Sequence, residues 1–286
     1  MVMAKSTPQP TITIRDLETL SDLERVIRLE KEVWELDDAD VIPLTLAVAI
    51  HAAGSIWVGA FNENELVGFA FAFPSLEEGR IGFHSHMLAV RASHRGLNIG
   101  YKLKLAQRQR ALAMGIREMT WTFDPLRSHN AHLNFSRLGV ESDSYRIDFY
   151  GPQTSSPLHV NGTDRLWVTW HMADPRVEER LKGKEIRSEV IDALAHVDPL
   201  VRFKGDGKPV EGDLYQALSR QRIAIEIPGD IGRIERNERE LARQWRLATR
   251  RAFTEALKAG FIVREFCRSI RGQQGPDAYL LERMRE

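Results

Sequence analysis

The segment from His84 to Gly115 constrains the fold of this chain more than any other. Leu88-Ala89-Val90 ends a run of strand-forming residues, a polar turn follows, and Arg95-Gly96-Leu97-Asn98-Ile99-Gly100 opens a helix expected over 98–114. Glycine adopts backbone conformations that other residues avoid, and the first amides of a helix have no partner within it. The helix dipole adds about half a positive charge at this end, so the turn predicts an anion site that fits a diphosphate. An ordinary helix-opening turn is the alternative interpretation.

The hydrophobic periodicity on both sides of this segment predicts a mixed α/β chain. A capping box is expected at Ser21, with Glu24 at the third helical position, and Gly115 is the expected C-terminal cap of the long helix. The expected strands are 11–15, 55–61, 66–73, 82–90, 118–123, 145–150, 166–172, 223–227, 261–266 and 279–281. Helices are expected from Ser21, after Pro43, and over 98–114, 130–137, 175–182, 214–220 and 237–259, with an exposed turn or hairpin tip at 204–209.

The turn and its surroundings resemble the GNAT superfamily of acetyltransferases. The acetyl-CoA turn of that superfamily reads Gln or Arg, two residues, Gly, one residue, then Gly or Ala, and Arg95 and Gly100 match it. Arg137-Leu138-Gly139-Val140 resembles its second motif, and the order of elements also agrees over roughly the first half of the chain. The resemblance implies a mixed, mostly antiparallel central sheet flanked by helices, followed here by a smaller C-terminal α/β domain.

We expect the chain to be divided into four segments. Residues 1–10 are expected to be disordered, 11–150 to form the acyl-CoA-binding domain, 151–163 to be a linker rich in turn residues, and 164–286 to form the C-terminal domain. Asp164-Arg165-Leu166 and Trp170 are similar to a subgroup of predicted acetyltransferases with such an extra half.

The resemblance implies an N-acetyltransferase that moves an acetyl group from acetyl-CoA directly to an unidentified amine, either a small amine or a protein amino group. The implied cofactor-binding residues are Leu88, Ala89, Val90, Arg95, Gly96, Leu97, Asn98, Ile99, Gly100, Asn130 and Phe135. Two of them depart from the family pattern. Asn98 replaces the middle glycine, although Asn tolerates unusual backbone geometry, and Phe135 replaces the tyrosine that protonates the thiolate in many members. A non-catalytic acyl-CoA-binding or regulatory module is therefore the alternative function.

Catalysis requires a base for the amine, and the expected strand 82–90 offers His84 and His86. Strand alternation predicts that both share a face with Leu88 and Val90, and His84 aligns with a catalytic Glu of some family members. A hydrogen-bonded structural role is the alternative for both histidines. Tyr145 is a candidate substitute for the absent acid, as is Tyr150, and both are also candidates for packing. Asn130 is either a contact to CoA or a helix cap.

The amino-acid composition limits the kinds of partner that this chain is expected to bind. Lys plus Arg and Asp plus Glu number 40 each, so no global charge favours binding to nucleic acid. Cys267 is the only cysteine, which excludes an intramolecular disulfide, and we expect no metal site. The polar start lacks a signal-peptide core, and no apolar stretch reaches the roughly 20 residues that span a bilayer. We therefore expect a cytoplasmic protein without membrane contact, and a homodimer is left open.

The second half contains an arginine stripe, formed by Arg236, Arg239, Arg243, Arg246 and Arg250 at helical spacing. A solvated face balanced by neighbouring glutamates is one interpretation, and a basic wall for an acidic substrate, the cofactor phosphates or a partner subunit is the other. Residues 223–266 also have the strand, helix, strand order of a degenerate second copy of the same half-fold. An acid in the Pro228-to-Gly232 turn argues against a second CoA site there.

Overall fold

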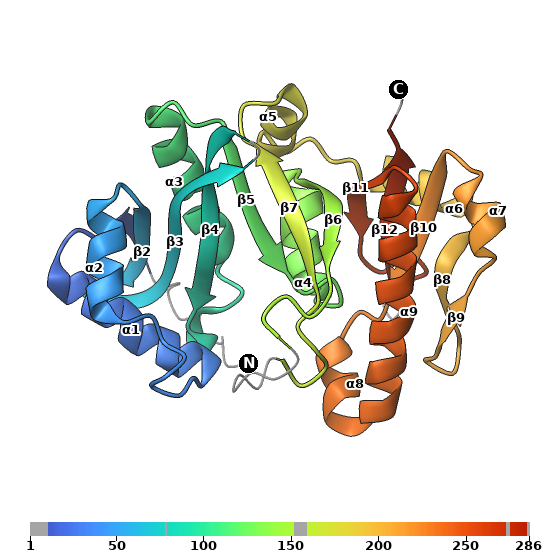
Figure 1. Ribbon diagram of the computed structural model, residues 1–286, viewed down its shortest axis with the longest axis horizontal. Coiled ribbons are helices and arrows are strands. Elements are labelled where there is room, and N and C mark those ends of the chain that lie inside the picture. Colours follow the sequence, from blue (N-terminus) through green and yellow to red (C-terminus); the bar gives the residue numbers. More distant parts are fainter. Residues whose placement is uncertain (1–10, 78, 152–158, 273–274, 285–286) are drawn as a thin grey trace, which may run out of the picture. The chain divides into compact units, whose positions relative to one another are not determined.

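The computed structural model describes residues 11–77, 79–151, 159–272 and 275–284, which form two compact units divided after Ile116 (Figure 1). The expected disorder of residues 1–10 lies outside the described residues, as do residues 152–158 of the expected linker. The division after Ile116 differs from the expected boundary at 151–163.

The first unit is an antiparallel sheet with strand order β1-β2-β3-β4, with helices on both faces. Its elements are β1 (Ile12–Asp16), α1 (Leu20–Trp34), α2 (Leu44–Ala52), β2 (Ile56–Asn62), β3 (Glu65–Glu77), β4 (Arg80–Val90), the 3-10 turn η1 (Ala92–His94) and α3 (Ile99–Ala113). The expected strand at 11–15, the helix after Pro43, the hairpin and the long helix are confirmed within a few residues at their ends.

The N-cap of α1 lies two residues before the expected cap at Ser21. Thr19 is its N-cap, because the Thr19 side chain accepts a hydrogen bond from the Asp22 amide and the Asp22 carboxylate accepts one from the Thr19 amide. Arg15 binds the same carboxylate at 2.9 and 3.0 Å and holds it in place. The predicted box at Ser21 and Glu24 is therefore wrong.

The core of the first unit lies between the sheet and the helices α1 and α2. Aromatic side chains dominate it, with Trp57 stacked on Phe71 at 4.0 Å between ring centroids and Trp34 edge-on to Phe69. The helix α3 covers the opposite face, where a Cβ added at Gly68 would lie 3.2 Å from the Ile99 side chain. The sheet thus separates α1 and α2 from the helix that follows the glycine turn.

The second unit contains a sheet with strand order β5-β7-β6-β11-β12-β10-β8-β9. Its strands are β5 (Glu118–Phe123), β6 (Glu141–Arg146), β7 (Arg165–His171), β8 (Pro199–Phe203), β9 (Pro209–Glu211), β10 (Arg222–Ile227), β11 (Phe261–Cys267) and β12 (Asp277–Arg283). Its helices are α4 (Ser128–Ala131), the π-helical segment η2 (His132–Leu138), α5 (Pro175–Leu181), α6 (Arg187–Ala195), α7 (Leu214–Leu218), α8 (Ile231–Asn237) and α9 (Arg239–Lys258). Because β7 pairs with both β5 and β6, strands on both sides of the expected linker belong to this one sheet.

The same connectivity occurs twice in this sheet. In β5, β6 and β7, the third strand lies antiparallel between the first two, and a helical segment joins the first to the second. In β10, β11 and β12, the third strand again lies antiparallel between the first two, which α8 and α9 connect. The two sets meet where β6 pairs antiparallel with β11. This arrangement supports the expected second half-fold, although its counterpart is the β5-to-β7 segment rather than the glycine turn.

Two details of the second unit differ from expectation. The strand expected at 145–150 is β6, at 141–146, and residues 147–150 form turns instead. The elements α6, β8, β9 and α8 were not predicted. The expected tip at 204–209 is confirmed as the connection of the antiparallel β8-β9 hairpin. Among the helices in the described ranges, none combines the length and the apolar character needed to cross a membrane.

Candidate functional site

The turn between β4 and α3 has the backbone geometry expected of an anion site. Gly96 has a φ of +83° and Asn98 a φ of +61°, so two positions of the turn adopt left-handed conformations. Backbone of this kind brings successive N–H groups onto one side. Among the described residues, the amides of Gly96, Leu97, Ile99 and Gly100 have no backbone acceptor. The expectation that Asn98 tolerates the geometry of the absent glycine is confirmed.

The helix behind the turn is held at both ends. At its start, Arg95 Nε donates to Val90 O at 3.3 Å, which links the turn back to the end of β4. At its end, Gly115 has a φ of +79°, and the amides of Gly115 and Ile116 donate to Leu112 O and Ala111 O. These bonds form a Schellman motif, so the predicted C-terminal cap is confirmed.

A β-bulge changes the faces of the two histidines. Met87 pairs with Phe71, but Ser85 pairs with Ala72, so His86 is an extra residue between them. His84 then pairs with Phe73, and the His84 and His86 rings lie 5.5 and 6.0 Å from the Phe73 ring. Both histidines therefore lie on the α1 and α2 side of the sheet. The prediction that they share a face with Leu88 and Val90 is wrong, because strict alternation does not survive a bulge.

His84 and His86 remain neighbours, with ring centroids 6.4 Å apart. Burial, together with the nearby His86 and Lys104, lowers the pKa of His84 to about 4. Burial also lowers the pKa of His86, although part of that ring reaches the surface. Both rings are therefore neutral at pH 7, each with a lone pair that can accept a proton.

A buried polar cluster that the sequence did not reveal lies on the other face of β4. Lys104 Nζ donates to Ser85 Oγ at 2.7 Å, and Ser85 Oγ donates to Gln107 Oε1 at 2.9 Å. All three residues are buried, and burial lowers the pKa of Lys104 well below its usual range. Two features of the sequence could have indicated it. Lys104 and Gln107 are polar residues three positions apart on the helix, and Ser85 lies between the two histidines on the strand. The cluster joins the helix after the anion turn to the strand of the histidines.

The other predicted site residues lie in the second unit. Asn130 is exposed and lies inside α4, whose N-cap is Arg127, so the alternative of a helix cap at Asn130 is wrong. Phe135 is fully buried and packs edge-on against Phe123 and Tyr279, at 6.2 and 5.7 Å between centroids. Its position within the core is that of a packing residue.

Tyr145 is held in a hydrogen-bonded and stacked position. Its hydroxyl donates to Asp164 Oδ2 at 2.6 Å, and its ring stacks on Phe253 at 5.6 Å. Burial raises the pKa of Tyr145 well above its usual range, and the Asp164 carboxylate adds to the effect. Tyr145 therefore releases its proton less readily than a free tyrosine would.

The arginine stripe divides into two parts. Arg236, Arg239 and Arg243 are exposed, and Arg243 pairs with Glu240 at 2.9 Å. Arg246 is only 3% exposed and pairs with Asp124 at 2.8 Å, and Arg250 binds Asp164 at 2.7 and 2.8 Å. Neither predicted role, a solvated face or a basic wall, holds for these last two arginines. Although burial alone would raise the pKa of Asp124, Arg246 holds it below its usual range.

Within the described part of the chain, no group of three or more His, Cys, Asp or Glu side chains is arranged to hold a metal ion.

One family model matches part of this chain. Residues 15–139 match the sequence model of the Acetyltransferase (GNAT) family, a span that includes the turn, both histidines, Asn130 and Phe135. No match was found among curated proteins.

Similar solved structures include the ribosomal-protein-S18-alanine N-acetyltransferase of Escherichia coli, at 15% identity and a TM-score of 0.46 over 57% of this chain and 96% of that one. A GNAT-family acetyltransferase of Streptococcus pneumoniae matches at 15% identity and a TM-score of 0.45, over 56% and 98% of the two chains. A putative acetyltransferase of Salmonella typhimurium, solved with its cofactor acetyl-CoA, matches at 16% identity and a TM-score of 0.45, over 57% and 97%.

Proposed function

Because residues 15–139 make this chain a member of the GNAT acetyltransferase superfamily, we propose that it moves an acetyl group from acetyl-CoA directly to an amine. The acceptor is a small amine or a protein amino group. The observation that carries the proposal is the turn before α3, where left-handed Gly96 and Asn98 accompany amides that have no backbone acceptor in the described residues.

The residues of the turn fit a diphosphate. The amides of Gly96, Leu97, Ile99 and Gly100 would donate to the phosphate oxygens, and the dipole of α3 would favour their charge. Arg95, which is exposed, would add a charged donor. The acyl arm would then follow β4 past Val90, Ala89 and Leu88, whose backbone amides are candidates to hold the thioester oxygen. From Val90 to His86 the strand covers about 13 Å at roughly 3.3 Å a residue.

The bulge is where we place the reaction. The amine nitrogen attacks the thioester carbonyl carbon, the new C–N bond forms, and the C–S bond breaks as CoA leaves as a thiolate. His84 takes the proton of the attacking amine, directly or through a water molecule, because its ring is neutral above pH 4 to 5. His86 is the second candidate for this role.

The thiolate takes its proton from solvent in this scheme. Phe135 has no hydroxyl, and the proton of Tyr145 is held by Asp164. In the proposal, Tyr145 therefore supports the fold of the second unit instead of supplying the acid. Asn130, exposed on α4, keeps its proposed role as a polar contact to CoA.

We also propose that the reaction takes place in the cytoplasm. Cys267 is a free, buried thiol, as suits a reducing compartment.

The alternative, a non-catalytic acyl-CoA-binding module, is favoured by the absence of a ready acid at Phe135 and Tyr145. Calorimetry with CoA, combined with release of free thiol from acetyl-CoA in the presence of a panel of amines, separates the two. The proposal expects both binding and amine-dependent thiol release. Binding without turnover by any amine would favour the module, and the absence of binding would exclude both.

A further inference from the structure

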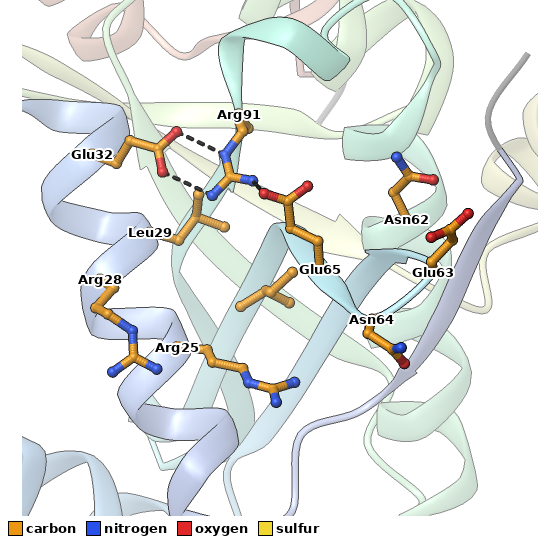
Figure 2. Close-up of a pocket in the computed structure, with 10 residues that line it drawn as sticks. Arg25, Arg28, Leu29, Glu32, Asn62, Glu63, Asn64, Glu65 and Arg91 are labelled. Atoms are coloured by element: carbon orange, nitrogen blue, oxygen red, sulfur yellow. Dashed lines mark hydrogen bonds and ion pairs between the residues drawn. The ribbon is translucent and has the colours of Figure 1, made fainter.

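A pocket of about 660 Å³ in the first unit lies between α1 and the turn that joins β2 to β3 (Figure 2). Its volume is within the range of roughly 300–1,000 Å³ found for small-molecule sites. Four of its residues, Arg25, Arg28, Leu29 and Glu32, come from α1, and the others are Arg91 and residues 62–66. None of these residues belongs to the site proposed above, so the pocket needs its own explanation.

One wall of the pocket is fixed by ion pairs. Arg91 binds both carboxylate oxygens of Glu32, at 2.7 and 2.8 Å, and also pairs with Glu65 (Figure 2). The hydrogen bonds that Arg91 donates to Glu32 raise the pKa of Arg91, so the pair is stable in its charged form. Two carboxylates of the pocket are therefore neutralised in part and held in place by one guanidinium.

The pocket has two further positive charges, those of Arg25 and Arg28. Arg25 and Arg28 are three residues apart and so lie on the same side of α1. Among the described residues, neither has an ion-pair partner within 4 Å, and the one lining carboxylate not bound to Arg91 is that of Glu63. In Figure 2 the Arg25 side chain extends from α1 below the pair formed by Arg91 and Glu65. The guanidinium has a planar fork of donors that matches a phosphate or carboxylate.

The pocket is connected to the anion turn. Arg91 directly precedes η1, and its amide donates to Val67 O at 2.8 Å. Asn62, on the rim, lies 3.3 Å from His94 at the end of η1, measured between Nδ2 and Nε2. Because η1 leads straight into Arg95 and Gly96, the chain runs from Arg91 of the pocket directly into the turn before α3.

We propose that this pocket binds a phosphate group through Arg25 and Arg28. Phosphate is favoured because it is a dianion that the guanidiniums of Arg25 and Arg28 can bind together, and because η1 joins Arg91 of the same pocket to the turn before α3. The phosphate has two possible sources, the 3′-phosphate of acyl-CoA or a separate phosphorylated small molecule. Only the first source depends on the function proposed above.

Calorimetry with CoA, dephospho-CoA and inorganic phosphate tests the proposal on three variants. In Arg25→Gln/Arg28→Gln both guanidiniums are removed, whereas Glu63→Gln removes the opposing carboxylate and should strengthen binding. The matched control is Lys31→Gln, which removes a positive charge of α1 outside the pocket that pairs with Asp38. Circular dichroism verifies that each variant is folded.

The source of the phosphate determines which ligand loses affinity in the double variant. If it is the 3′-phosphate, wild type binds CoA about tenfold or more tightly than dephospho-CoA, and the double variant loses this preference while Lys31→Gln keeps it. If it is a separate ligand, CoA and dephospho-CoA bind equally, and the double variant loses one saturable phosphate site that wild type and Lys31→Gln keep. The proposal would be overturned if the folded double variant bound each of the three ligands with the same affinity as wild type. Because the phosphate measurement needs no CoA, the pocket can be judged even if wild type fails to bind CoA.

Discussion

At the scale of the residue, His84 carries most of the proposed chemistry. It is 8% exposed and lies beside the Phe73 ring and His86. With its pKa lowered to about 4, the ring is neutral near neutral pH, and it is a weaker base than a free histidine. Burial makes the ring less basic because it disfavours the charged, protonated form.

Replacement of His84 by Gln should lower kcat by about 10² to 10⁴, the range of general-base catalysis. In wild type, protonation of His84 should reduce kcat/KM only as the pH falls toward 4, since the pKa is lowered to about 4. Steady-state rates from about pH 3.5 to 9 measure both effects, and His86→Gln, measured in the same way, tests the second candidate base. Undiminished turnover in His84→Gln would contradict the assignment of His84 as the base. A wild-type inflection near pH 6.5 that this variant abolishes would contradict the lowered pKa of His84.

Glu30 is a second buried titratable residue of the first unit. It is 0% exposed, its Oε1 accepts a hydrogen bond from the Ile42 amide at 3.4 Å, and its Oε2 has no hydrogen-bond partner in the described residues. Burial raises the pKa of Glu30 from 4.5 to about 7. The folded state therefore favours the protonated carboxyl, which ties α1 to the segment before α2.

The free energy of unfolding should fall as the pH rises through this range. An acid whose pKa is raised on folding contributes fully below pH 4.5, and its contribution is lost as the pH rises to 7, by about 3 kcal/mol for such a shift. Glu30→Gln should remove this part of the pH dependence, as urea denaturation between pH 5 and 8 would show. An identical slope in wild type and variant would mean that Glu30 titrates normally.

At the scale of the element, the turn and the bulge at the two ends of the proposed acyl path show what a sequence does and does not disclose. The turn was predictable, because Gly96, Asn98 and Gly100 are residue types with known backbone preferences. The bulge was not, because it depends on the register of β4 against β3 and moves His84 to the opposite face without any change in local composition. The cap of α1 was misplaced for a similar reason, since Arg15 on the preceding strand selects Asp22.

Asn98 provides the test at this scale. Its φ of +61° should suit glycine, so Asn98→Gly should leave CoA affinity and stability within about 0.5 kcal/mol of wild type. Asn98→Val places a β-branched residue in the left-handed region, which should cost about 1–3 kcal/mol. Urea denaturation gives the stability of each variant and calorimetry its affinity for CoA. If valine were as well tolerated as glycine, the turn would not have the described conformation in solution.

At the scale of the whole chain, the second unit owes its order to buried ion pairs between distant segments. Asp164 is fully buried at the start of β7 and binds Tyr145, the Asp148 amide and Arg250 of α9. Arg246 binds Asp124, which directly follows β5. The helical spacing of the arginines was visible in the sequence, but their partners lie 86 and 122 residues away along the chain, so the spacing could not distinguish a solvated face from a buried one.

Removal of the Asp164 carboxylate should show how far the stability of the second unit depends on these ion pairs. Asp164→Ala removes the acceptor of the Tyr145 hydroxyl and leaves the Arg250 guanidinium paired with Asp148 alone, which should lower the free energy of unfolding by about 3 kcal/mol. Arg243→Ala on the same helix removes an exposed, solvent-screened pair with Glu240 and should change stability much less than Asp164→Ala does. Chemical denaturation compares the two, and equal losses would show that the buried network does not hold α9 to the sheet.

The central claim is that the turn before α3 binds the diphosphate of acyl-CoA, and charge reversal at Gly100 tests it most directly. A glutamate in the first turn of α3 is compatible with the helix, since acidic residues stabilise helix N-termini, but it would repel the phosphates. By calorimetry, CoA should bind to wild type and to the uncharged control Gly100→Ala with similar affinity, and on the order of 100-fold more weakly to Gly100→Glu. CoA binding to a folded Gly100→Glu variant with the wild-type affinity would contradict the account.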